Sequence, residues 1–96
     1  MKYKYEITTH GDKLREGFME ARNPKKILRS SLLETGFTGS TIRVHIVNEE
    51  GRVWIYMFKP DHLQKKYRKV GKIEDFIHKE VAQAIMKKEM DYTDIL

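Results

Sequence analysis

The sequence predicts an α+β fold, in which helices pack against a three-stranded antiparallel sheet. Residues 41–59 indicate the sheet, because two β-prone segments flank a turn there, as in a β-hairpin. Residues 72–90 indicate helix, because their apolar residues recur at the three- and four-residue spacing of an amphipathic helix. The chain has 96 residues, the length of one domain, so we expect a single α+β domain over residues 1–96.

An N-terminal strand is expected over residues 2–9. Tyr3, Tyr5 and Ile7 alternate there with polar residues, and this period of two indicates a strand with one buried face. His10-Gly11 then ends the alternation. This strand and the two strands of the hairpin make up the predicted sheet.

Helical structure is expected over about residues 12–35. Asp12 is a good helix cap, and apolar residues follow it at helical spacing. Asn23-Pro24 then restarts the helix, since asparagine caps well and proline is tolerated at the first helical position. Two short helices or one kinked helix are therefore predicted, with Gly36 as the cap at the end.

The hairpin 41–59 can be predicted almost residue by residue. Asn48 to Gly51 supplies a type I turn with the glycine in the left-handed region, which makes a three-residue loop with a bulge. In the resulting register, three cross-strand pairs share the core face: Ile46 with Trp54, Val44 with Tyr56, and Ile42 with Phe58. The opposite face is half apolar, so we expect something to cover part of it. Its apolar residues are Val47, Val53, Ile55 and Met57.

The C-terminal third is predicted to be helical. Pro60-Asp61 is expected to end the second hairpin strand and to begin a short helix, which Val70-Gly71 interrupts. A longer amphipathic helix is then expected over about residues 72–90. Acidic residues in its first turn and lysines in its last suit the helix dipole.

Composition excludes several classes of protein. The chain has no cysteine, so a disulfide framework or a thiolate zinc site is impossible. No apolar run approaches the roughly 20 residues of a membrane-spanning helix, and the charged start lacks the apolar core of a signal peptide. We therefore expect a folded cytoplasmic protein with no membrane partner.

No residue pattern indicates catalysis or metal binding. Serines and threonines lie near helix ends or loops, where hydroxyls usually bond to local backbone. The four histidines are scattered without a metal-ligand spacing. Thr35 to Ser40 holds two glycines beside hydroxyls but lacks the lysine of a phosphate-binding loop. We expect a protein that is not an enzyme and uses no metal or cofactor.

Basic residues are the best functional candidates. The net charge is +5, and the excess gathers in a segment around Tyr67 and in a second group around Asn23-Pro24. Lysine and arginine neutralise phosphates, and an aromatic ring can stack on a base. The sequence therefore predicts a patch that binds DNA or RNA, with these candidate residues: Lys65, Lys66, Tyr67, Arg68, Lys69, Lys72, Lys25, Lys26 and Arg29.

A protein-interaction module is the alternative interpretation. It would be a homodimer, or an adaptor from a phage or another mobile genetic element. Its motivation is the half-apolar second face of the hairpin, the strand 2–9 as a sheet edge, and the apolar end Ile95-Leu96. Exposed apolar patches and unpaired strand edges are common interfaces. The sequence leaves both interpretations open.

Overall fold

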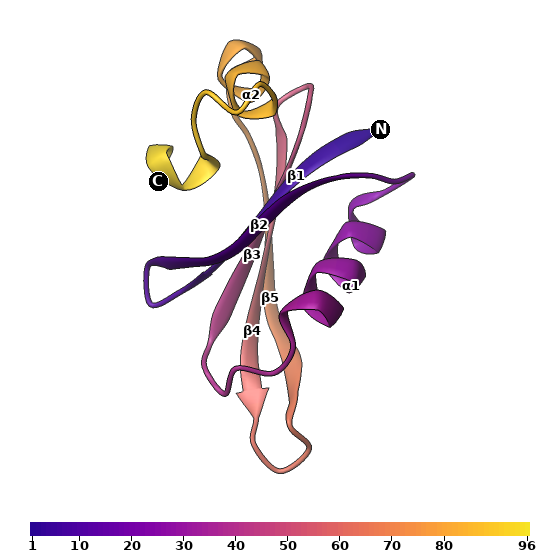
Figure 1. Ribbon diagram of the computed structural model, residues 1–96, viewed down its shortest axis with the longest axis vertical. Coiled ribbons are helices and arrows are strands. Elements are labelled where there is room, and N and C mark those ends of the chain that lie inside the picture. Colours follow the sequence, from indigo (N-terminus) through magenta and orange to yellow (C-terminus); the bar gives the residue numbers. More distant parts are fainter.

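A computed structural model describes all 96 residues and shows an α+β fold built on a five-stranded antiparallel sheet (Figure 1). The strand order across the sheet is β2-β1-β3-β4-β5. The α+β class is confirmed, whereas the prediction of three strands was two too few. The elements are β1 (Lys2–Thr9), β2 (Asp12–Glu20), α1 (Pro24–Thr35), β3 (Ile42–Asn48), β4 (Arg52–Asp61), β5 (Lys66–Phe76), α2 (Lys79–Met86) and the 3-10 helix η1 (Tyr92–Ile95).

Residues 12–20 form strand β2, so the helix predicted there was wrong. His10 and Gly11 have φ angles of 51° and 84°, and positive φ at both central residues is the feature of a type I′ hairpin turn. This turn folds β2 back onto β1 in an antiparallel register from Thr9 opposite Asp12 to Lys2 opposite Glu20. The tight turn therefore outweighed the helical spacing of the apolar residues.

Strand β5 occupies the region where a short helix and the start of the C-terminal helix were predicted. β4 continues to Asp61, whose Oδ1 accepts the backbone N–H groups of Leu63 and Gln64, each at 3.1 Å. The side chain thus stabilises a turn and not a helix, and β5 pairs with β4 along its length. The C-terminal helix is shorter than predicted, with eight residues from Lys79 to Met86.

Helix α1 begins and ends as predicted. The Asn23 side chain accepts the backbone N–H of Lys26 at 3.2 Å, and Pro24 is the first helical residue. Gly36 follows the helix with φ 73°, and its N–H donates to the Leu32 carbonyl at 3.0 Å. α1 packs across β1, β2 and β3, to one side of the β4–β5 end of the sheet (Figure 1).

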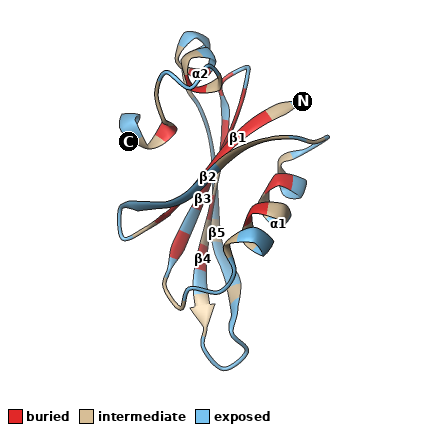
Figure 2. Ribbon diagram, viewed as in Figure 1, coloured by how far each residue is buried: buried red, intermediate tan, exposed pale blue.

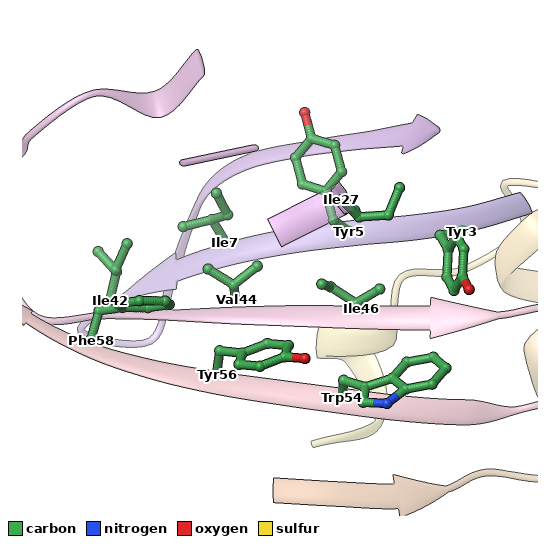
Figure 3. Close-up of a cluster of buried hydrophobic side chains, with 10 residues drawn as sticks. All are labelled: Tyr3, Tyr5, Ile7, Ile27, Ile42, Val44, Ile46, Trp54, Tyr56 and Phe58. Carbon is green, nitrogen blue, oxygen red and sulfur yellow. The ribbon is translucent and has the colours of Figure 1, made fainter. Parts of the chain in front are cut away.

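The main core lies on the α1 face of the sheet and confirms the predicted hairpin register. Ile46 pairs with Trp54, Val44 with Tyr56, and Ile42 with Phe58. The three aromatic residues are at most 6% exposed, so they are core residues (Figure 3), and Figure 2 shows buried segments of the sheet in red. The ten buried residues of this cluster are Tyr3, Tyr5, Ile7, Ile27, Ile42, Val44, Ile46, Trp54, Tyr56 and Phe58.

The C-terminal segment covers part of the opposite face. Val47 and Val53 are buried there in a second cluster with Ala82, Ile85 and Tyr92. Hydrogen bonds also join this segment to β1, because the buried Glu6 carboxylate accepts the backbone N–H groups of Tyr92 and Thr93 in η1. No helix is long and apolar enough to reach across a membrane.

Candidate functional site

The end of the β4–β5 hairpin projects beyond the rest of the sheet. β3 begins at Ile42, which pairs with Phe58. Beyond that pair, Lys59 to Asp61 of β4 are opposite only Lys66 to Arg68 of β5. Residues 59–68, which we call the hairpin tip, therefore form a two-stranded ribbon at one extreme of the molecule (Figure 1).

Aromatic contacts anchor the hairpin tip to the loop that follows α1. The ring centroid of Tyr67 lies 6.4 Å from that of Phe58 and 5.4 Å from that of Phe37. The Tyr67 hydroxyl accepts the backbone N–H of Thr38 at 2.8 Å. Phe37 also meets the ring of His62 nearly edge-on at 6.0 Å. Tyr67, predicted as a stacking residue, is half-buried and holds the tip in position.

Unpaired positive charge concentrates on this hairpin tip and on Lys69, the residue of β5 that directly follows it. Residues 59–69 contain five basic side chains and one carboxylate, that of Asp61. All five are exposed, and none belongs to any salt bridge of the structure. We call them the tip cations: Lys59, Lys65, Lys66, Arg68 and Lys69.

The strand conformation of β5 divides the predicted basic cluster between two faces. Successive side chains of a strand point to opposite sides of the sheet. Tyr67 and Lys69 share the α1 face, whereas Lys66 and Arg68 lie on the other. A register shift between Met57 and Phe58 then returns Lys72 to the α1 face. The cluster is thus a ribbon with cations on both faces.

Lys69 and Lys72 cover the core aromatic Tyr56. Their Nζ atoms lie 5.9 and 5.8 Å from its ring centroid, within the range of a cation–π interaction. α1 lies across β1 to β3, so these long side chains shield the ring on the β4–β5 side. Lys72 also lies 3.7 Å from Glu74, which makes it the one candidate residue with an acidic partner.

The other end of β4 and β5 differs from the tip because its charges are paired. Arg52 donates to the Glu74 carboxylate at 2.8 Å. This hydrogen bond, helped by the nearby charge of Lys72, holds the pKa of Glu74 below its usual range. Within β4 and β5, the cations are therefore paired with Glu74 at this end and unpaired at the tip.

A groove of about 370 Å³ separates the hairpin tip from the C-terminal half of α1. Its rim has basic residues from both elements, its walls are partly apolar, and no carboxylate lines it. The lining residues are Arg29, Leu32, Leu33, Gly36, Phe37, Lys65, Lys66 and Tyr67.

Only part of the second basic group reaches this groove. Arg29 lines it, whereas Lys25 and Lys26 belong to the preceding helical turn. Residues three and four apart are neighbours on a helix surface, so the two lysines extend the basic surface along α1, away from the tip. The structure thus brings Arg29 to Lys65 and Lys66, with Lys25 and Lys26 adjacent on the helix.

The predicted site lacked four residues of the groove, Leu32, Leu33, Gly36 and Phe37, of which Leu33 and Phe37 are large, exposed apolar residues. They are 78% and 36% exposed, respectively. The position of Phe37 between Gly36 and Gly39, in a loop of small polar residues, was the one available signal. A lone aromatic in a loop does not show which surface it joins, because that depends on tertiary packing.

The structure also changes the basis of the protein-interaction alternative. Val47 and Val53 are covered by the chain itself, and β1 lies between β2 and β3, so residues 2–9 are not an edge. The exposed edges are β2 and β5. Along β5, three apolar residues are exposed by about half or more: Val70, Ile73 and Phe76.

Comparison with known proteins does not assign this chain to a family. No protein-family model, curated protein or solved structure matches it. The geometry and charge of the hairpin tip are therefore the basis on which a function can be proposed.

Proposed function

We propose that this protein binds nucleic acid through the hairpin tip and the adjoining face of α1. The observation that supports this proposal is the local density of unpaired cations: the five tip cations lie within residues 59–69, and none has an acidic partner. By contrast, Lys4, Lys13 and Arg15 near the opposite edge of the sheet are all in ion pairs. Unpaired, exposed cations keep their charge available for phosphates.

The shape of the tip suits contact with a phosphate backbone. A two-stranded ribbon is narrow enough to approach a nucleic acid closely, and a β-ribbon fits the major groove of B-DNA. Cations on both faces of the ribbon allow phosphates to be contacted on either side of it. The contacts are to phosphate, so they favour polyanions without selecting a base sequence.

The salt dependence of binding gives a quantitative expectation. Each phosphate neutralised adds about 0.9 to the slope of log affinity against log salt on duplex DNA, and about 0.7 on single strands. Contacts from the five tip cations, with or without Arg29, therefore predict a slope of about −4.5 to −5.4 on a duplex. Fluorescence anisotropy over a salt series measures this slope directly.

A matched pair of charge-reversal variants tests the location of the site. Lys65→Glu with Lys66→Glu changes the tip, whereas Lys79→Glu with Lys87→Glu makes the same change at the two ends of α2, at the other extreme of the molecule (Figure 1). All four lysines are exposed. The tip variant should weaken binding at least about tenfold and reduce the slope by about 2, since two phosphate contacts are lost.

The α2 variant serves as the control for net charge, and circular dichroism checks that both variants fold. Equal weakening by both variants would mean that overall charge, and not the hairpin tip, determines binding. A wild-type protein that binds neither DNA nor RNA at low salt would refute the proposed function altogether.

Strand addition by a partner protein is the second candidate function. The edge strand β5 runs for 11 residues, and its exposed apolar residues include Ile73 and Phe76. Its free backbone groups could pair with an extended chain. Lysines on an edge strand disfavour pairing with an identical edge, so the partner strand would be acidic. Binding of acidic peptides that is abolished by proline substitution within β5 would support this candidate.

A further inference from the structure

We infer that the groove beside the hairpin tip receives unstacked bases, so that the ligand is single-stranded nucleic acid. This inference rests on the proposed function and specifies its ligand. It comes from the groove lining, which combines cations with exposed apolar and aromatic surface and contains no carboxylate.

The apolar lining is the feature that phosphate contacts leave unexplained. Leu33 is 78% exposed and Phe37 is 36% exposed, both next to Arg29 and the tip cations Lys65 and Lys66. Large apolar side chains grouped on a surface commonly mark a binding site. A site for phosphate alone would need only the cations, so the apolar side chains point to a ligand with flat apolar surfaces.

Nucleic acids differ in whether they offer such surfaces. In a duplex, the faces of the bases are stacked on one another, and proteins reach only phosphates, sugars and base edges in the grooves. In a single strand, the base faces are accessible and stack on aromatic side chains without requiring a particular sequence. The lining therefore matches a single strand better than a duplex.

The arrangement of Phe37 suits stacking. Tyr67 supports it from the tip, with the two ring centroids 5.4 Å apart and the planes inclined at 44°. Tyr67 is itself fixed by Phe58 and by the backbone of Thr38, so the support is rigid. A ring held in place loses little conformational entropy when a base stacks on it.

The cations flank the apolar surface from two elements. Arg29 projects from α1, whereas Lys65 and Lys66 belong to the tip on the other side of the groove. A strand lying in the groove would place bases against Phe37 and Leu33 while its phosphates meet cations on either side. The volume of about 370 Å³ lies within the roughly 300–1,000 Å³ of small-ligand sites, so base-sized groups fit.

Comparison of single-stranded and duplex ligands tests this inference without any variant. Labelled 20-nucleotide single strands of DNA and RNA are titrated in parallel with a duplex of the same sequence, at one salt concentration. We expect the single strands to bind at least about tenfold more tightly, because base stacking adds to the phosphate contacts. Equal or tighter binding of the duplex would overturn the inference.

Two phenylalanine variants then locate the stacking surface. Phe37→Ala should weaken single-strand binding about 5- to 150-fold, the range for one lost base–aromatic stack, while the salt slope and duplex affinity stay unchanged. Phe76→Ala is the matched control, since Phe76 is also exposed, at 73%, but lies at the other end of β5. Phe37→Tyr keeps an aromatic ring and should restore binding.

The outcomes separate this inference from the proposed function. If Phe37→Ala acts no more strongly than Phe76→Ala, while Lys65→Glu with Lys66→Glu weakens both ligands, nucleic-acid binding stands and base stacking in the groove is refuted. If the wild-type protein binds neither ligand, both proposals fail. Quenching of 2-aminopurine placed within the single strand gives an independent signal for a stacked base.

Discussion

Substitution of Glu6 by glutamine should destabilise the protein by about 2–4 kcal/mol. Glu6 is 1% exposed, and its carboxylate accepts three hydrogen bonds from the C-terminal segment. The donors are the backbone N–H of Tyr92 at 2.6 Å, the backbone N–H of Thr93 at 3.1 Å and the Thr93 hydroxyl at 2.8 Å. The same carboxylate lies 3.2 Å from the equally buried ammonium of Lys4.

The magnitude follows from these contacts. Hydrogen bonds to a charged group contribute roughly 1.5–3 kcal/mol each, and loss of one partner of a buried ion pair costs about 3–5 kcal/mol. Glutamine keeps one carbonyl oxygen as an acceptor, but it replaces the other oxygen by an N–H donor that faces donors. Lys4 retains contacts with Glu16 and Asp91, which reduces the loss. We therefore expect an intermediate value, a large share of the about 5–14 kcal/mol typical of a domain this size.

Urea unfolding followed by the fluorescence of Trp54, the single tryptophan, measures the effect. Glu16→Gln is the matched control, because Glu16 also contacts Lys4 but has a side chain that is 41% exposed; it should cost less than about 1 kcal/mol. Amide hydrogen exchange at Tyr92 and Thr93 should accelerate in the Glu6 variant. A Glu6→Gln protein that is as stable as Glu16→Gln would refute the role given to this carboxylate.

Two further predictions concern stability. Burial lowers the pKa of His45 below its usual 6.5; the charge of Arg43 adds to this shift and that of Glu6 opposes it. The unfolded chain therefore binds a proton at His45 more readily than the folded protein does. The free energy of unfolding should fall as the pH drops below 6.5, by at most about 1.4 kcal/mol per pH unit. Urea unfolding between pH 7.5 and 5 should show this slope in the wild type and a flatter one in His45→Gln; equal slopes would contradict it. Gly51→Ala should lose more than about 2 kcal/mol in thermal unfolding, because φ is 92° and a Cβ would lie 2.4 Å from a backbone carbonyl oxygen. Gly11→Ala, with φ 84° and nothing within 4 Å, should lose only about 1–2 kcal/mol, and a similar loss in both would show that the close contact is unimportant.

The elements predicted correctly are those that local residues determine. The turn from Asn48 to Gly51 sets the register of β3 and β4, and Gly51 has the expected positive φ. The start of α1 is likewise determined by local residues, because Asn23 caps the helix and Pro24 occupies its first position. No distant residue was needed for either prediction.

The errors fall where pairing with another strand decides the structure. The apolar residues of 12–20 suit both a helix and a strand, and the His10-Gly11 turn selected the strand. Gly17 was a usable signal, since glycine weakens a helix. In the structure the Tyr5 ring lies only 2.9 Å from the position that a Cβ of residue 17 would take. For β5, pairing with β4 overrode the helical spacing at Ile73 and Phe76.

The candidate site was predictable in its charges but not in its geometry. The density of lysines and arginines in the sequence predicted the basic cluster that forms much of the tip. The structure then places Arg29 of α1 beside Lys65 and Lys66. The division of the cations between two faces depends on β5 being a strand, which was not foreseen. Phe37 joins the groove through contacts with His62 and Tyr67, residues 25 and 30 positions later in the chain.

The attachment of η1 to β1 has a consequence for protein synthesis. The hydrogen bonds of Glu6 join positions 86 and 87 residues apart, and β1 is an inner strand of the sheet. Because a ribosome releases the chain from its N-terminus onwards, the buried side chains of Lys4 and Glu6 emerge long before their partners in residues 91–93. Until Thr93 has left the exit tunnel, Lys4 and Glu6 must stay hydrated, so this side of the sheet can close only after η1 has emerged.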